Sequence, residues 1–146
     1  MKEARRDMLL AAAAPMLQEL EEVQLMTFAR VGSVSAKRKI ATAATAAVLS
    51  AGILMVSVHP REMYLVLTDR RILFFDGHTA TGRPGKHLMT VPRDLVTVSS
   101  ARGKGLGLAI EVELGLEGQD KNLKILFPTP SKEEGRQFIA ALPATS

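Results

Sequence analysis

The residues best able to do chemistry in this chain are cationic, and three of them are consecutive. Lys37, Arg38 and Lys39 form a basic triplet, and Arg30 and Arg61 lie near the two ends of the same connection. Such side chains bind carboxylates and phosphates, and each cation near an anionic membrane contributes about 1 kcal/mol. We predict that these five residues form a ligand or membrane surface. The alternative is that the triplet only caps and solubilises the apolar segment behind it.

Charge is distributed unevenly along the sequence. The net charge is +4, but residues 30–104 contain twelve Lys or Arg against four Asp or Glu. Residues 1–29 and 105–146 are each slightly acidic. A basic middle predicts one positive face and an anionic partner, an anionic lipid surface or an acidic protein, unless it is an ordinary solvated surface. Nucleic acid is not expected, because no helix-turn-helix signature is present and Tyr64 is the only polar aromatic residue.

Residue types suited to catalysis or metal binding are few. The absence of cysteine excludes thiolate nucleophiles and Cys-ligated metals, and it is compatible with the cytoplasm. His59, His78 and His87 lie in or beside predicted loops, and their spacing indicates no further zinc ligand. Glu111 and Glu113 are interpreted as surface charges on a solvated strand face. We therefore predict no catalytic residue, no metal, no cofactor and no enzymatic activity.

Two glycine-rich stretches are interpreted as turns. Gly82–Lys86 has the pattern G-x-x-G-K, but a phosphate-binding P-loop has four residues between its glycines and is followed by a helix. Here His87 and a predicted strand follow. The G-x-G-x-G pattern of Gly103, Gly105 and Gly107 also precedes a strand and is typical of a hairpin turn.

The stretch MYLVLTDRRILFFDG, residues 63–77, predicts the central hairpin. Its Val, Leu, Tyr and Phe residues suit a half-buried strand, which predicts strands at Met63–Thr68 and Ile72–Asp76. Asp69–Arg71 form the polar turn between them. Val23–Val34 and His87–Ser100 are predicted as further strands, the second kinked at Pro92.

Strict alternation predicts one more strand at Leu106–Glu117, after a loop at Arg102–Gly105. The residues expected to face the core are Leu106, Leu108, Ile110, Val112, Leu114 and Leu116, continued after a turn by Leu123, Ile125 and Phe127.

Helices are predicted near both ends. Residues 3–22 are rich in Ala and Leu but are interrupted by Pro15, which predicts one helix up to Ala13 and a second from Pro15 through Glu22. Ser131 and Glu134 have the spacing of a capping box and predict a C-terminal helix that ends near Leu142 and buries Phe138, Ile139 and Leu142.

The T-D-R-R turn, the V-P-R sequence at Val91–Arg93 and the closing helix resemble a bacterial pleckstrin-homology-like (PH/GRAM-like) domain over roughly residues 23–142. The resemblance implies an α+β, mainly β fold with a bent antiparallel sheet of six or seven strands and a C-terminal capping helix. Residues 1–22 would be an N-terminal helical extension. The resemblance also implies a non-catalytic binding module, and it places Lys37–Lys39 in the loop with which lipid-binding relatives bind their ligand.

Residues 36–58 would be an apolar, Ala-rich insertion in this domain. Residues 40–58 contain no charged residue. The segment is the length of a membrane span, but it contains few Ile, Leu and Val residues. We favour a buried helix at Ala41–Ser50 and a strand at Ile53–Val58 over a membrane span. The expected location is the cytoplasm, with or without association with a membrane surface. The alternative function is protein interaction or self-assembly through residues 40–58 or a sheet edge, which leaves a homo-oligomer open.

Overall fold

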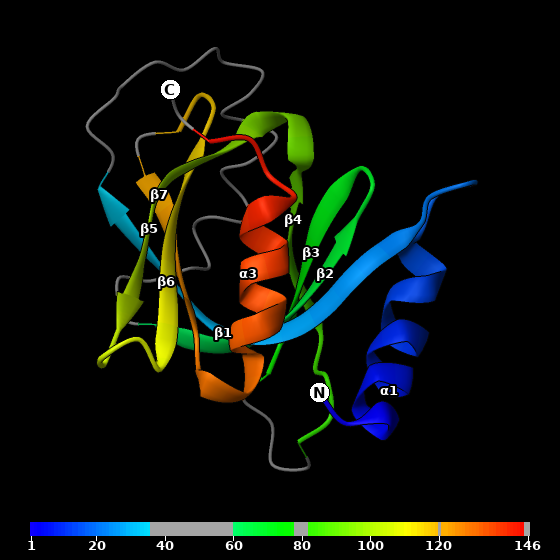
Figure 1. Cartoon of the computed structure of the whole chain (residues 1–146). Helices are drawn as coiled ribbons and strands as arrows, with labels where there is room; N and C mark the ends of the chain where they lie inside the picture. The colour runs from blue at the N-terminus through cyan, green and yellow to red at the C-terminus, as the bar shows by residue number, and fades with distance from the viewer. Residues whose placement is uncertain (36–59, 78–81, 120, 145–146) are drawn as a thin grey trace.

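The chain folds around one antiparallel sheet of seven strands. The computed structural model of the chain describes residues 1–35, 60–77, 82–119 and 121–144. The strand order is β4-β3-β2-β1-β7-β6-β5, with α1 and α3 near the two ends of the chain (Figure 1). The predicted mainly β architecture of six or seven strands with an N-terminal and a C-terminal helix is confirmed.

The strands are β1 Val23–Ser35, β2 Arg61–Thr68, β3 Arg71–Asp76, β4 His87–Pro92, β5 Val96–Lys104, β6 Ala109–Leu116 and β7 Lys121–Phe127. The helices are α1 Glu3–Ala13 and α3 Lys132–Ala140, with short 3-10 turns η1 Ala14–Met16, η2 Arg93–Leu95 and η3 Thr129–Ser131. The predicted kinked strand at residues 87–100 is thus two strands, β4 and β5, separated by η2 directly after Pro92.

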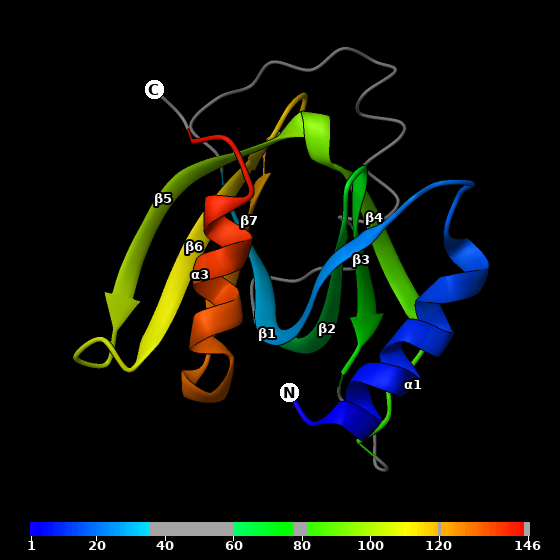
Figure 2. The same ribbon diagram turned by 45° about the vertical axis from the view of Figure 1, so that its right-hand side comes forward.

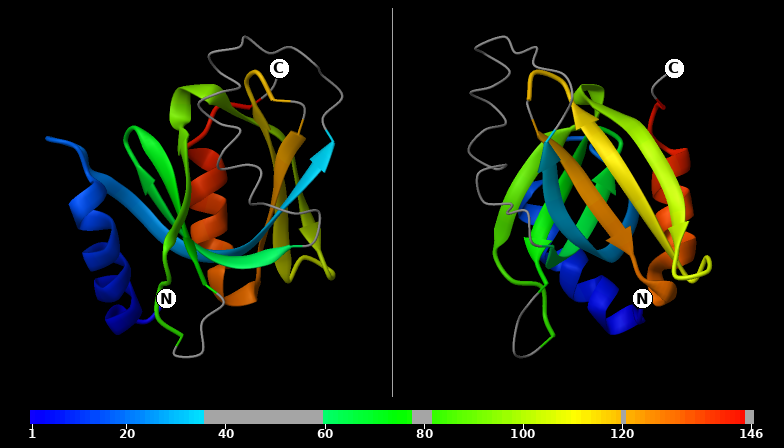
Figure 3. Two further views of the ribbon diagram at one scale, coloured as in Figure 1. Left: turned by 180° about the vertical axis from the view of Figure 1, so that it is seen from behind. Right: turned by 90° about the vertical axis from the view of Figure 1, so that its left-hand side faces the viewer.

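β1 is the strand about which the sheet bends. Residues 23–31 of β1 pair with β2, whereas residues 30–35 pair with β7. One strand therefore belongs to both halves of the sheet, and the halves enclose an interior that α3 closes (Figures 2 and 3).

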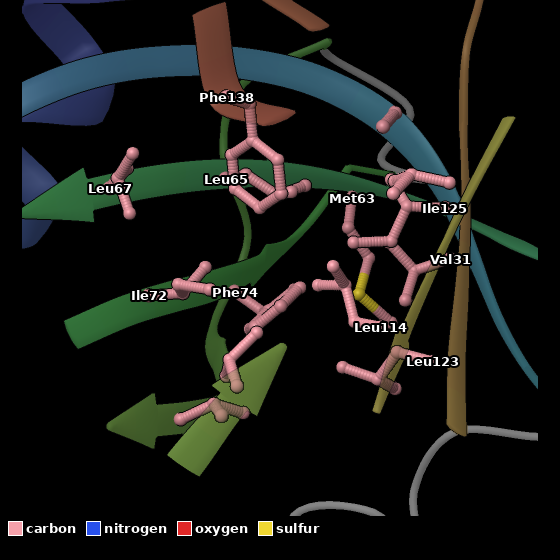
Figure 4. Close-up of a cluster of buried hydrophobic side chains, with 14 of the residues drawn as sticks. Val31, Met63, Leu65, Leu67, Ile72, Phe74, Leu114, Leu123, Ile125 and Phe138 are labelled. Carbon is pink, nitrogen blue, oxygen red and sulfur yellow. The ribbon is translucent and has the colours of Figure 1, made fainter. Parts of the chain in front are cut away.

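The main core fills this interior (Figure 4). Its side chains come from both halves of the sheet and from α3, and half of them have no solvent exposure. Phe138 of α3 is fully buried, and its ring lies 5.4 Å from that of Phe127 of β7. The predicted inward row is confirmed for Val112, Leu114, Leu116, Leu123, Ile125 and Phe127.

The prediction was wrong at the start of that row. Leu106 and Leu108 are exposed, at 105% and 62%, and Ile110 is only partly buried. β5 continues through Lys104, so residues 102–104 of the predicted loop are strand, and the reversal falls at residues 105–108. The alternating leucines run on into this turn, where the chain has left the sheet and alternation no longer selects a face.

A second apolar cluster lies on the outer face of β2 and β3, where α1 packs (Figure 1). Leu9 and Ala13 of α1 contact it, and the strands contribute Tyr64, Val66, Leu73 and Phe75. The central strands are therefore buried on both faces, which explains why the central hairpin has nearly continuous apolar runs instead of alternation.

The predicted second helix at residues 15–22 is not present. α1 ends at Ala13 as predicted, but Pro15 lies in η1 and the chain then runs through a turn at residues 19–20 into β1. Leu20 has a φ of 65°, which no helix accommodates. The turn allows Glu21 to reach the central hairpin, and that contact outweighs the helical propensity of the segment.

α3 begins one residue after Ser131 and runs to Ala140, close to the predicted bounds. Ser131 makes no side-chain capping bond; the Glu134 carboxylate instead lies 3.3 Å from the backbone nitrogen of Met1. The predicted burial of Phe138 and Leu142 is confirmed, while Ile139 is partly buried against the core.

Gly135→Ala is expected to destabilise the protein, although alanine normally stabilises a helix by about 1 kcal/mol relative to glycine. A Cβ at Gly135 would lie 2.6 Å from Cγ of the Phe127 ring. The close approach of α3 to β7 should make the substitution cost about 1–3 kcal/mol. Urea unfolding would measure this, with Gln137→Ala on the exposed side of α3 as control. A Gly135→Ala protein more stable than wild type would contradict the packing.

Candidate functional site

Only two of the five cations predicted to form one surface, Arg30 and Arg61, belong to the described residues. Lys37–Lys39 lie outside the described residues. Arg30 of β1 and Arg61 of β2 are both exposed, but Arg30 pairs across the strands with Glu62, so Arg61 points to the opposite face of the sheet. Arg61 also donates a hydrogen bond to Asp76 at 2.8 Å. The structure does not bring Arg30 and Arg61 together, and their binding role stays a prediction.

A groove between β5, the β5–β6 turn and α3 gathers cations within the described residues. Its volume is about 450 Å³. The residues lining it are Ala101, Arg102, Gly103, Gly107, Ile110, Lys132, Arg136, Ile139 and Ala140. Three of these are cationic, none is acidic and the others are apolar or glycine; Arg102 pairs with Glu111 at 3.0 Å and Arg136 with Glu133 at 3.5 Å. We call this groove the basic groove.

Two elements hold the walls of the basic groove in place. Arg102 extends from β5, which is an edge strand of the sheet, and Lys132 and Arg136 lie four residues apart on one side of α3. Thr129 Oγ1 of η3 donates a hydrogen bond to the backbone oxygen of Leu108 at 2.8 Å. This bond ties the hairpin to the start of α3, so both walls are positioned before any ligand arrives.

Glu111 is less exposed than the surface charge predicted for it. Its side chain is only 12% exposed and lies within 4 Å of three cations, Arg102 at 3.0 Å, Lys104 at 3.7 Å and Lys124 at 3.5 Å. Its neighbour on the same face, Glu113, accepts a hydrogen bond from Asn122. Three cations against the two carboxylates leave net positive charge on this side of the hairpin, and the bond to Glu111 holds the Arg102 guanidinium on the face of the sheet that is turned away from the core.

The tip of the β5–β6 hairpin carries two exposed leucines beside these cations. Leu106 and Leu108 are among the few large apolar side chains exposed in the described residues. The hairpin projects from the sheet on the side of the molecule opposite α1 (Figure 2). The local sequence KGLGL therefore places apolar side chains at the outermost point of a cationic hairpin.

The T-D-R-R turn forms a structural ion-pair cluster that holds the N-terminal segment. Glu21 is buried; its carboxylate is bonded to the Arg71 guanidinium, to Thr68 Oγ1 at 2.6 Å and to the backbone N–H of Gln18 at 2.8 Å. These bonds, chiefly that of Arg71, outweigh desolvation and lower the pKa of Glu21 to about 2. The same carboxylate raises the pKa of Arg71. A carboxylate so fully bonded is structural.

The other arginines of the two resemblance motifs are also occupied within the fold. Arg70 bonds Gln18 at 3.0 Å and the backbone oxygen of Glu19 at 3.1 Å. Arg93, from the V-P-R sequence, donates to the backbone oxygens of Thr68 at 2.9 Å and Ala141 at 2.7 Å. T-D-R-R and V-P-R thus join the central hairpin, the N-terminal segment and the end of α3.

In the part of the chain that the structure describes, no three His, Asp or Glu residues lie close enough together to hold a metal ion. His59 and His78 lie outside the described residues. His87 Nε2 lies 2.6 Å from Thr90 Oγ1. Partial burial lowers the pKa of His87, and the positive charge of Arg71 adds to the effect. Gly82–Lys86 leads into β4, as the turn interpretation predicts.

No helix among the described residues is long and apolar enough to cross a bilayer. The predicted insertion at residues 36–58, with its proposed helix, strand or span, lies outside the described residues.

Sequence reasoning did not find the basic groove. Its cations come from two elements that are distant in the sequence, Arg102 from β5 and Lys132 and Arg136 from α3. In the sequence each of them resembles an ordinary surface charge. The one sequence signal was the i, i+4 spacing of Lys132 and Arg136, which places both cations on one helix face. That this face borders the same hollow as β5 depends on the packing of α3 against the sheet.

The sequence matches no family model and no curated protein. Among solved structures, the fold is similar to the crystal structure of a pleckstrin homology domain from Shewanella amazonensis SB2B, with a TM-score of 0.55. The match covers 99% of this chain and 93% of that one at 18% sequence identity, a level that establishes the fold alone. The bent seven-stranded sheet closed by α3 is therefore a pleckstrin-homology-like fold.

Proposed function

We propose that this chain is a non-catalytic binding module that engages an anionic membrane surface through the basic groove. The observation that carries the proposal is the lining of that groove, in which Lys132 and Arg136 of α3 and Arg102 of β5 border an apolar surface and no lining residue is acidic. Phosphate and carboxylate headgroups match such a site by charge. Lys37–Lys39, with Arg30 and Arg61, stay a predicted second source of positive charge.

The expected affinity follows from the number of cations. Each Lys or Arg near an anionic surface contributes about 1 kcal/mol, and the effect falls off within a Debye length of about 8–10 Å. Three groove cations give at most about 3 kcal/mol, because Arg102 and Arg136 also pair with Glu111 and Glu133, and this corresponds to weak and reversible binding. Binding should therefore be detectable at low salt and nearly absent at high salt.

Lys132→Ala/Arg136→Ala is expected to weaken binding to vesicles of phosphatidylcholine and phosphatidylserine about 30-fold at about 50 mM salt, because two cations are lost. Co-sedimentation with vesicles measures this. Neither residue contributes to the core, so the fold should be kept. The charge-matched control is Lys2→Ala/Arg6→Ala, whose residues are exposed at the start of α1 and do not line the basic groove.

The same assay separates the groove from the basic triplet. Loss of binding in Lys37→Ala/Arg38→Ala/Lys39→Ala protein, with Lys132→Ala/Arg136→Ala unaffected, would move the site to the triplet and away from the groove. Equal weakening by the groove variant and its α1 control would show that only net charge matters. Wild-type protein that ignores anionic vesicles at low salt would refute the membrane proposal altogether.

A second candidate is protein interaction through the edge of β5. Val98 of β5 already forms a parallel bridge with Ala144, and its N–H donates to the backbone oxygen of Pro143 at 2.7 Å. The following residues, Ser99–Gly103, are all exposed. An edge that accepts one strand residue from its own chain supports strand addition from another protein. A concentration-dependent oligomer that ignores vesicles would favour this function.

A further inference from the structure

We propose that the tip of the β5–β6 hairpin inserts Leu106 and Leu108 into the bilayer when the basic groove meets an anionic membrane. This inference rests on the proposed function and deepens it, because it adds an apolar contact to an electrostatic one. The proposal starts from the exposure of Leu106, whose side chain has no protein cover at all, and of Leu108, at 62%.

The backbone of the tip is built to present these side chains. Leu106 has a φ of 61°, in the left-handed region that leucine rarely adopts. Gly105 and Gly107 on either side also have positive φ, and a Cβ at either position would meet no atom within 4 Å. The two glycines accommodate the positive φ of the turn without strain, whereas Leu106 between them is a strained and fully exposed leucine.

The tip is also fixed in position. The N–H of Gly107 donates to the backbone oxygen of Lys104 at 3.2 Å, and that of Leu108 donates to Gly105 at 3.3 Å. The bond from Thr129 to the Leu108 oxygen anchors the far side of the turn to η3. Insertion of a turn already ordered by these bonds loses little conformational entropy on binding.

The charges around the tip select an anionic bilayer as its partner. Lys104 and Arg102 lie two and four residues behind Leu106, which corresponds to at most about 7 and 13 Å along a strand. Apolar side chains of interfacial elements are buried about 5–10 Å into the headgroup and acyl boundary. When Leu106 reaches that depth, these two cations lie near the level of the headgroups.

A second copy of the chain fits this hairpin less well. Two tips brought together would also bring together Arg102, Lys104 and Lys124, which already share the single carboxylate of Glu111. Like charges placed opposite one another oppose association. An anionic lipid surface provides both the apolar layer for the leucines and the negative charge for the cations.

Leu106→Asn is the direct test, because asparagine tolerates positive φ and removes the apolar side chain without adding strain. The matched control is Leu20→Asn, since Leu20 is also exposed, at 84%, and has a φ of 65°, but belongs to the turn after α1. In co-sedimentation with phosphatidylcholine–phosphatidylserine vesicles, Leu106→Asn should bind about tenfold more weakly than wild type. Leu20→Asn should bind like wild type.

Salt dependence separates the two contributions. Added salt should weaken wild type and Leu106→Asn in parallel, because the leucine contact is not electrostatic, whereas Lys132→Ala/Arg136→Ala should flatten the salt dependence. The chain has no tryptophan, so Leu106→Trp creates a single fluorophore at the tip. Its emission should shift to the blue on vesicles and be quenched by brominated lipid chains.

Each outcome decides the proposal. Wild-type binding with Leu106→Asn unchanged, or Leu106→Trp emission that stays that of exposed indole on bound vesicles, overturns insertion and leaves the proposed function standing. Absence of wild-type binding overturns both. Sedimentation velocity that finds a wild-type dimer, dissociated by Leu106→Asn but not by Leu20→Asn, assigns the tip to self-association and overturns the bilayer as its partner.

Discussion

Val112→Asp should abolish folding at ordinary temperature. Val112 has no solvent exposure and lies in the middle of β6, between β5 and β7. The substitution loses the burial of an apolar side chain and places a carboxylate where the interior offers no cation, so we expect a cost of at least about 5 kcal/mol. Domains of this size are stable by about 5–15 kcal/mol in total. Circular dichroism and amide NMR dispersion would show the loss of structure directly.

Two neighbouring substitutions serve as controls for this prediction. Ile110→Asp should be milder than Val112→Asp, because Ile110 is partly exposed and lines the basic groove. Glu111→Ala should cost at most about 1 kcal/mol, because its cationic partners are largely exposed and such pairs contribute little to stability. A folded Val112→Asp protein, or equal losses for all three variants, would mean that β6 is turned over relative to this structure.

Glu21→Ala is expected to lower the free energy of unfolding by about 3 kcal/mol, because it removes one partner of a buried ion pair. The Arg71 side chain is 19% exposed and would keep only its bond to the backbone oxygen of Met16. Thr68 would lose its carboxylate acceptor as well. Urea unfolding measures the loss, and hydrogen exchange should show that residues 16–22 lose protection before the sheet does.

The same ion pair predicts a dependence of stability on acid. The pKa of Glu21 is lowered from 4.5 to about 2 by folding. A group with a lowered pKa in the folded state stabilises the protein above its unfolded pKa, and this contribution is lost as the pH falls toward the folded value. Stability should therefore decrease between about pH 5 and pH 2.

Glu21→Gln isolates this effect, because the amide keeps the shape of the side chain but cannot titrate. Glu21→Gln protein should be less stable than wild type at pH 7 and should lose less stability than wild type on going to pH 2. Glu19→Gln, at an exposed neighbouring position, should follow the wild-type curve. If the Glu21→Gln and wild-type curves stayed parallel down to pH 2, the carboxylate of Glu21 would not be the group that titrates.

The sequence by itself determined the elements whose patterns are local. The central hairpin, β1, the β6–β7 pair from Val112 to Phe127 and α3 are predicted because a strand or helix with one buried face repeats its apolar residues at a fixed period. Glycine and proline marked several of the reversals, including the one at residues 105–108. The pleckstrin-homology-like resemblance was carried by T-D-R-R and V-P-R, whose Arg71 and Arg93 connect distant segments.

Tertiary structure decided the features that depend on which segments meet. Residues 15–22 have helical propensity, yet Glu21 bonds Arg71, fifty positions away, and the segment runs as a turn and an extended stretch. Leu106 and Leu108 continue the apolar alternation, yet periodicity cannot show where the chain leaves the sheet. The basic groove exists only because α3 packs beside the β5–β6 hairpin, which brings Lys132 and Arg136 to the same hollow as Arg102. Local pattern specifies each element and its buried face, whereas the packing of elements distant in the sequence determines which exposed side chains share a surface.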